Sequence, residues 1–205
     1  IANITVVTPK LNEVQAFDTG PGNMVIDGAV RLLTGGKKSI DKDGTLAAKG
    51  NVIDEFLDYL LDHPYFNLLP PKSTGREIFG PEIYIRDALA SRDKHTHEDL
   101  IATITKAVSV SIESAFKRFV LPNYEVERLI ISGGGAHNKT LMRHLKNGLP
   151  EITVRRSDHY NIPADAREAI AFAILGNETI CGTPANVPSA TGANRSVILG
   201  QITPA

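Results

Sequence analysis

A buried strand, a run of glycines and a helix follow one another in the stretch LIISGGGAHNKTLMRHL, residues 129–145. Leu129–Ile131 is wholly apolar, which is typical of a strand that is covered on both faces. Apolar residues at helical spacing predict a helix from about Asn138 to Lys146. The glycines between them are Gly133, Gly134 and Gly135. This order places bare backbone at a helix N-terminus, where a flat or charged ligand can approach closely.

Two interpretations of this stretch compete. In the first, the glycines form a tight turn from strand to helix, and Asn138 lies near the helix cap. In the second, they form a ligand site, because three consecutive glycines lose more backbone entropy on folding than a cap requires. The entropy argument favours the ligand site. The stretch is neither a P-loop, since no Lys-Ser/Thr pair follows the glycines, nor a G-x-G-x-x-G fingerprint.

A second glycine-rich stretch, FDTGPGN, covers residues 17–23. Asp18 ends an apolar strand pattern, Gly20 and Gly22 follow, and Asn23 precedes a helical pattern over residues 24–33. One interpretation is a tight turn that needs glycine for its backbone angles, with Asp18 as a turn or capping acid. The other is a phosphate-binding loop beside an acid that takes or holds a proton.

The remaining sequence alternates strands and helices. Residues 2–8 and 13–18 read as two strands in a hairpin-like connection, and another strand is expected near residues 152–154. Apolar spacing predicts helices over residues 51–61 and 100–120. Three prolines make residues 63–80 a long loop. The pattern predicts an α/β fold with one mixed sheet flanked by helices.

Composition narrows the class of protein. The chain has 205 residues and a net charge of −1, so nothing in it indicates a nucleic acid or an anionic membrane as partner. No apolar run reaches membrane-spanning length, and the six histidines lack metal-ligand spacing, so we expect no protein-held metal. The only cysteine, Cys181, excludes an intrachain disulfide and suits a reducing compartment such as the cytoplasm.

Five stretches together resemble one family. FDTGPGN, PPKSTGRE, ISGGGAHNKTLM, DAREAIAFAIL and NVPSATGA are similar, in this order, to the signatures of 1,6-anhydro-N-acetylmuramic acid kinases. The resemblance implies the ribonuclease H-like fold of actin, hexokinase and Hsp70, a sugar substrate, and ATP with Mg²⁺ held mainly through the phosphates. It implies that Asp18 is the general base, which activates a water while the anhydro bridge opens and O6 is phosphorylated. The ATP-binding residues implied are Gly20, Gly22, Asn23, Gly133, Gly134, Gly135 and Asn138.

For the residues that bind the sugar, the resemblance leaves alternatives open. Glu168 is in the family's position for a hydrogen bond to the sugar, but Asp165–Glu168 also has the spacing of a helix capping box. Arg76 and Lys72 lie in the proline-rich loop. A guanidinium there can pair with the lactyl carboxylate of a muramic acid, and the alternative is a solvated loop charge.

The family is nearly twice as long as this chain, and its Gly-Thr-Ser phosphate loop is missing here. The chain also opens inside a strand pattern without a Met. We therefore expect residues 1–205 to form the second, C-terminal lobe of a two-lobed kinase, with an excursion at about 36–122 and little activity alone. Two alternatives stay open: a non-catalytic sensor of the same fold, and a kinase for an ordinary sugar hydroxyl. A homodimer is compatible with either.

Overall fold

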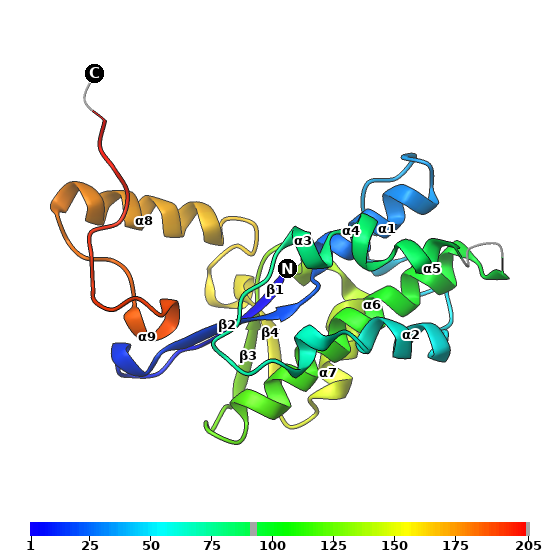
Figure 1. The fold of residues 1–205 in the computed structure, drawn as a ribbon, viewed down its shortest axis with the longest axis horizontal. Coiled ribbons are helices and arrows are strands. Elements are labelled where there is room, and N and C mark those ends of the chain that lie inside the picture. The colour runs from blue at the N-terminus through cyan, green and yellow to red at the C-terminus, as the bar shows by residue number, and fades with distance from the viewer. Residues whose placement is uncertain (91–93, 204–205) are drawn as a thin grey trace.

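The computed structural model describes residues 1–90 and 94–203 and contains four strands in two separate pairs (Figure 1). β1 (Ala2–Val6) pairs antiparallel with β2 (Gln15–Gly20), and Asn3 lies opposite Asp18. β3 (Arg128–Ile131) pairs parallel with β4 (Thr153–Arg156) across the helix that joins them. The predicted hairpin and the strands after it are confirmed.

The expected single mixed sheet is not formed. β1 pairs with β2 alone and β3 with β4 alone within the described residues. Each pair is closed by its own connection, and no described strand lies between β1 and β3 to bridge them. Because each sheet has only two strands, most of the stabilising contacts must come from the helices that pack on the sheets.

The helices make up most of the fold. Their bounds are α1 Asn23–Leu33, α2 Asp54–Leu61, α3 Arg76–Phe79, α4 Pro81–Tyr84, α5 Arg86–Ala90, α6 His97–Ala115, α7 Lys139–Gly148, α8 Arg167–Cys181 and α9 Pro188–Thr191. The long helix expected over residues 100–120 is α6, which continues into a π-helical turn at Phe116–Val120. Thr96 and Asp99 form a capping box at its start, so the helix begins before the predicted residue.

The main core lies around α6. This helix packs on α1, α2, α7 and β2, and Leu100, Ile104 and Val108 are almost completely buried on it. Phe79 lies at the centre of an aromatic cluster, with its ring edge-on to those of Tyr65 and Tyr84. The predicted excursion at residues 36–122 therefore includes the helix on which the core is built.

The C-terminal part stands away from this core. In Figure 1, α8 extends away from the helices of the core, and α9 lies near the tip of the β1–β2 hairpin and contacts β2. No residue of α8 is buried, and Phe172 and Ile180 are among its exposed apolar side chains. The loop before α8 is tied to the glycine run, where Gly133 N–H donates to the carbonyl of Ala164 over 3.1 Å.

Candidate functional site

Asp18 is held by the proline-rich loop, which lies far from it in the sequence. Its carboxylate Oδ2 accepts hydrogen bonds from the Ser73 hydroxyl at 3.0 Å and from the Thr74 N–H at 2.9 Å. Its own N–H donates to the carbonyl of Lys72 at 3.0 Å. Both hydrogen bonds to the carboxylate in the described chain end on Oδ2, so Oδ1 stays available to a water.

A tyrosine fixes the backbone of Asp18 from the other side. The Tyr65 hydroxyl donates to the carbonyl of Asp18 at 2.9 Å. Burial raises the pKa of Tyr65 to about 12, and the negative charge of Asp18 adds to this. Tyr65 therefore remains a hydrogen-bond donor at neutral pH, and the half-buried acid is clamped at its backbone and at one carboxylate oxygen.

Ser73, Thr74 and Tyr65 are not among the site residues predicted from the sequence. Ser73 and Thr74 lie in the PPKSTGRE motif, of which only the charged residues Lys72 and Arg76 are predicted to act. A hydroxyl beside a backbone N–H is a frequent donor pair for a carboxylate, so the motif held a usable signal. Tyr65 gave no such signal, because its partner is a backbone carbonyl 47 residues away.

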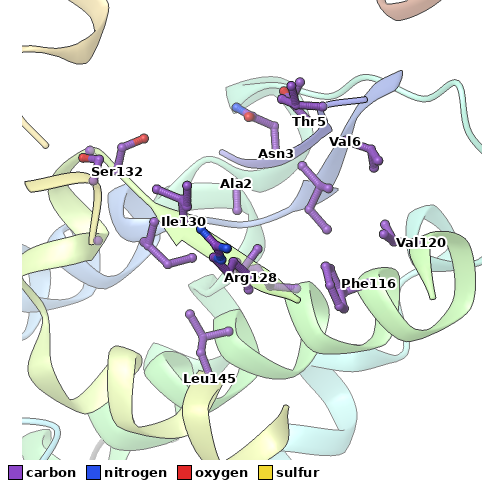
Figure 2. A pocket seen from close by; sticks show the side chains of 18 of the residues that line it. Ala2, Asn3, Thr5, Val6, Phe116, Val120, Arg128, Ile130, Ser132 and Leu145 are labelled. Atoms are coloured by element: carbon purple, nitrogen blue, oxygen red, sulfur yellow. The ribbon is translucent and has the colours of Figure 1, made fainter. Parts of the chain in front are cut away.

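The two glycine-rich stretches meet at one cavity of about 1420 Å³, which is drawn in Figure 2. Gly22, Asn23 and Gly133–Gly135 all line this cavity. A Cβ built on Gly134 would lie 3.3 Å from Nδ2 of Asn23, so the two stretches touch. The prediction that they face one cleft is confirmed.

Glycine is required at these positions for different structural reasons. A Cβ on Gly20 would lie 2.7 Å from the Phe66 ring, and one on Gly22 would lie 2.7 Å from the Ile1 backbone, so packing alone excludes a side chain at both positions. Gly133 differs, because it has a φ of 78° and a ψ of −176° and nothing within 4 Å of its built Cβ. Its backbone therefore lies open, in a conformation that is almost restricted to glycine.

The start of α1 is suited to an anion. Gly22 is the N-cap residue, no side chain caps the helix, and the first turn contains no acid. The Asn23 side chain turns inward along the helix and donates to Asp27 at 2.9 Å. Free N–H groups at the end of an 11-residue helix attract negative charge, so this end of the cavity can receive phosphate oxygens.

Asn138 caps α7. Its Oδ1 accepts from the Leu141 N–H at 2.9 Å, and its side chain is 3% exposed. Its buried Nδ2 makes no hydrogen bond within the described residues. The capping interpretation of Asn138 is therefore confirmed, and its predicted contact with ATP stays a prediction.

Glu168 lies at the rim of the same cavity, in the first turn of α8. Of the two interpretations of Asp165–Glu168, the capping box is wrong, because Ala166 is the N-cap residue and no side chain caps α8. Asp165 instead pairs with Nε2 of His137 at 2.8 Å. The Glu168 side chain is 83% exposed, and its one ion pair among the described residues is a 3.8 Å contact with Arg167, so the carboxylate is accessible to a ligand.

The two basic residues of the proline-rich loop are placed differently. Lys72 is buried, its ammonium lies 4.7 Å from the Tyr65 ring centre, and it donates to the Tyr65 carbonyl. Burial lowers the pKa of Lys72, and the nearby Arg118 guanidinium lowers it further. The expectation of a solvated loop charge is therefore wrong for Lys72. Arg76 is exposed at the start of α3.

The described residues form no group of three His, Cys, Asp or Glu side chains that would hold a metal ion. None of the helices in residues 1–90 and 94–203 is long and apolar enough to cross a membrane.

Comparison with known proteins places the chain among the sugar kinases. The sequence model of one family, described as anhydro-N-acetylmuramic acid kinase, matches residues 1–205. The chain belongs to the anhydro-N-acetylmuramic acid kinase family.

Individual relatives agree with this assignment. The chain is similar to anhydro-N-acetylmuramic acid kinases of Clostridioides difficile strain 630, at 48% identity over 207 residues, and of Bacillus cereus strain ZK / E33L, at 44%. A relative from Caldanaerobacter subterraneus subsp. tengcongensis is 45% identical. These alignments cover 98–100% of this chain but 52–53% of each relative, so the chain spans about half their length.

Proposed function

We propose that this chain supplies the general base and part of the nucleotide site of an ATP-dependent sugar kinase. The reaction converts 1,6-anhydro-N-acetylmuramic acid, water and ATP to N-acetylmuramic acid 6-phosphate and ADP. The observation that carries the proposal is the clamped carboxylate of Asp18, which keeps Oδ1 available to a water, in a member of this family.

The atoms balance with Asp18 as the base. Its carboxylate takes a proton from a water, and the water oxygen bonds to the anomeric carbon of the sugar. The bond from that carbon to the bridging oxygen breaks, and this oxygen, O6, takes the γ-phosphoryl group of ATP. ADP leaves. Since phosphoryl transfer depends mostly on positioning and charge stabilisation, the clamp at Oδ2 has a direct use.

The nucleotide fits the wall where the two glycine-rich stretches touch. Open backbone at Gly133 and Gly134 and the uncapped start of α1 are the features that support this. We assign the phosphates to the side of Gly20, Gly22 and Asn23. Mg²⁺ would be held mainly through the phosphates of the nucleotide.

The sugar contacts we propose come from two exposed residues. Arg76 would pair with the lactyl carboxylate, and Glu168 would accept a hydrogen bond from a sugar hydroxyl. Lys72 is enclosed by aromatic rings, so we give it the supporting role of holding the loop that carries Ser73 and Thr74.

The chain corresponds, in this proposal, to the second lobe of an actin- or hexokinase-type kinase. The remaining phosphate contacts would come from a first lobe, and the enzyme would act in the cytoplasm during recycling of cell-wall sugars. Binding energy at the γ-phosphoryl group drives transfer, so the 205-residue chain alone should form little product. Robust product formation by this chain alone from ATP, Mg²⁺ and the anhydro sugar would contradict the lobe assignment.

The base is tested by Asp18→Asn in the complete kinase. Asparagine keeps the size and the hydrogen bonds but cannot accept a proton at neutral pH. We expect turnover to fall by about 10²- to 10⁴-fold while ATP affinity changes little. Asn caps and turns about as well as Asp, so a structural role predicts near wild-type turnover, and that result would reject Asp18 as the base.

A further inference from the structure

Three glycines in a row need support from outside the run if they are to keep one conformation. Glycine loses more backbone entropy on folding than any other residue, so the run Gly133–Gly135 would be mobile by itself. One side chain of α1 lies behind it. A Cβ built on Gly134 would lie 3.3 Å from Nδ2 of Asn23, and one built on Gly135 would lie 3.7 Å from Cβ of Asn23. Asn23 therefore supports the glycine run.

The Asn23 side chain is itself held by Asp27, one turn further along α1. Its Nδ2 donates to Oδ2 of Asp27 at 2.9 Å. Burial raises the pKa of Asp27, whereas the charge of Arg31 and a hydrogen bond from the Asp41 backbone lower it. Asp27 thus accepts from its own helix on one side and from the loop after that helix on the other.

The loop Asp41–Gly44 has hydrogen bonds of its own. The Asp41 carboxylate is buried, and its two oxygens accept from the N–H groups of Leu46 at 2.8 Å and Ala47 at 3.0 Å. The N–H of Gly44 donates to the carbonyl of Asp41 at 3.0 Å. Because the carboxylate and the turn both fix it, this loop can maintain a constant spacing between the elements that it contacts.

The same loop is fastened to the start of α7, the helix that follows the glycine run. The buried Thr140 hydroxyl donates to the carbonyl of Gly44 at 2.7 Å. A Cβ built on Gly44 would lie 2.8 Å from the Thr140 nitrogen, and Gly44 has a φ of 71°, so a side chain is excluded here. Lys139 pairs with Asp43 at 3.4 Å in the same place. Both helices that begin at glycine-rich stretches are therefore attached to one loop.

These contacts support the glycine run from two directions. Asn23 lies behind its middle, and α7 fixes its downstream end. A wall that is already ordered costs less entropy when a ligand binds to it, and supporting residues behind the wall supply that order.

We propose that Asp27 and Thr140 are positioning residues for the nucleotide. Asp27 holds Asn23 against Gly134, and Thr140 holds the start of α7 to the loop after α1. Neither Asp27 nor Thr140 lines the cavity, so both act through other residues. This assignment rests on the proposed function, which puts the nucleotide where the two glycine-rich stretches touch.

The first test compares Asp27→Ala with Asp27→Asn in the complete kinase, by calorimetric titration with a non-hydrolysable ATP analogue and Mg²⁺. Alanine releases the Asn23 side chain, so we expect the analogue to bind about tenfold more weakly, since binding must then order free groups. Asparagine keeps an acceptor oxygen and should stay within about threefold of the unmodified kinase. Affinity for the anhydro sugar alone should change less than about twofold in both, since neither variant alters the residues assigned to the sugar.

Asp58→Ala is the matched control, because Asp58 is an exposed acid on α2 that does not line the cavity. It should leave both affinities unchanged. Equal binding of the analogue by Asp27→Ala and Asp58→Ala would overturn the proposal. Equal losses for the analogue and the sugar would also overturn it, because they would show a general loss of structure.

The second test is made at the other attachment. Thr140→Val removes the hydroxyl and leaves the Gly44 carbonyl without it, whereas Thr140→Ser keeps the donor. We expect valine to weaken analogue binding about tenfold and serine to restore it to within about threefold. Equal affinities of the two variants would contradict the role of Thr140. If Thr140→Val proves unfolded by circular dichroism, the Asp27 variants decide, since alanine is well tolerated inside a helix.

The unmodified kinase separates this proposal from the proposed function. If it binds no analogue, the nucleotide site itself is wrong, and the positioning roles fall with it. If it binds the analogue and makes product while Asp27→Ala binds equally well, only the positioning roles are wrong.

Discussion

The Ser73 hydroxyl lies 3.0 Å from Oδ2 of Asp18 and donates a hydrogen bond to it, although 55 residues separate the two along the chain. The Thr74 N–H meets the same oxygen at 2.9 Å. The acid is therefore oriented by a loop and not by its own strand alone. Because the two donors use one oxygen, the other keeps its lone pairs for a proton.

Removing this hydroxyl should impair turnover more than binding. In the complete kinase we expect Ser73→Ala to lower kcat by about tenfold, because a net hydrogen bond to a charged group contributes roughly 1.5–3 kcal/mol and Thr74 still holds Oδ2. The KM for ATP should stay within about twofold. Steady-state kinetics with Ser73→Thr as control checks this, since threonine retains the hydroxyl and should restore most of kcat. An increase in KM with an unchanged kcat would rule out the positioning role.

Gly133 and Gly176 should respond oppositely to alanine. Gly133 has a φ of 78° and a ψ of −176°, a region costing a residue with a side chain about 1–3 kcal/mol, so Gly133→Ala should lower the free energy of unfolding or shift the loop. Gly176 lies inside α8 with nothing within 4 Å of its built Cβ, so Gly176→Ala should raise the free energy of unfolding by about 0.5–1 kcal/mol. Urea denaturation of both variants compares them. The same sign for both would contradict the loop conformation.

Acid should destabilise the fold through His144. Burial, then the charges of Lys106 and Arg143, lowers the pKa of His144 to about 4. The unfolded chain binds this proton near pH 6.5, so the stability from neutral His144 is complete above pH 6.5 and is lost as the pH falls toward 4. The loss can reach about 3 kcal/mol, since each pKa unit corresponds to about 1.4 kcal/mol.

The measurement is the unfolding free energy between pH 4 and pH 7, compared with His144→Gln, which cannot titrate. The difference between the two proteins should change across this range. A constant difference between the unmodified chain and His144→Gln would show that His144 is not responsible.

Two phenylalanines separate the packed body from the protruding helix. Phe79 is completely buried among aromatic rings, so Phe79→Ala should cost about 3–5 kcal/mol of unfolding free energy. Phe172 on α8 is 71% exposed, so Phe172→Ala should change the unfolding free energy by less than about 0.5 kcal/mol. Thermal or chemical denaturation of the two variants checks the contrast. Similar losses would mean that α8 packs on the body in solution.

Local patterns decided much of what could be predicted from the sequence. Alternating and helical spacing gave the hairpin, α1, α6 and α7, because the faces that these elements bury repeat with the period of their own backbone. The glycines of the two loops were visible as well, since strand, glycine and helix follow one another without interruption. Both glycine-rich stretches proved to lie at one cavity, as their shared pattern predicted.

Only the tertiary structure decided which groups the site residues contact. Asp18 meets Ser73 and Tyr65 across 47 or more residues, and no spacing rule connects an acid to a donor in a distant loop. The same holds for Asp165, whose sequence spacing indicated a helix cap but whose carboxylate pairs with His137. The sequence could not predict the two separate strand pairs for a related reason. Alternation along a strand specifies which face is buried, but not which neighbour supplies the hydrogen bonds at its edge.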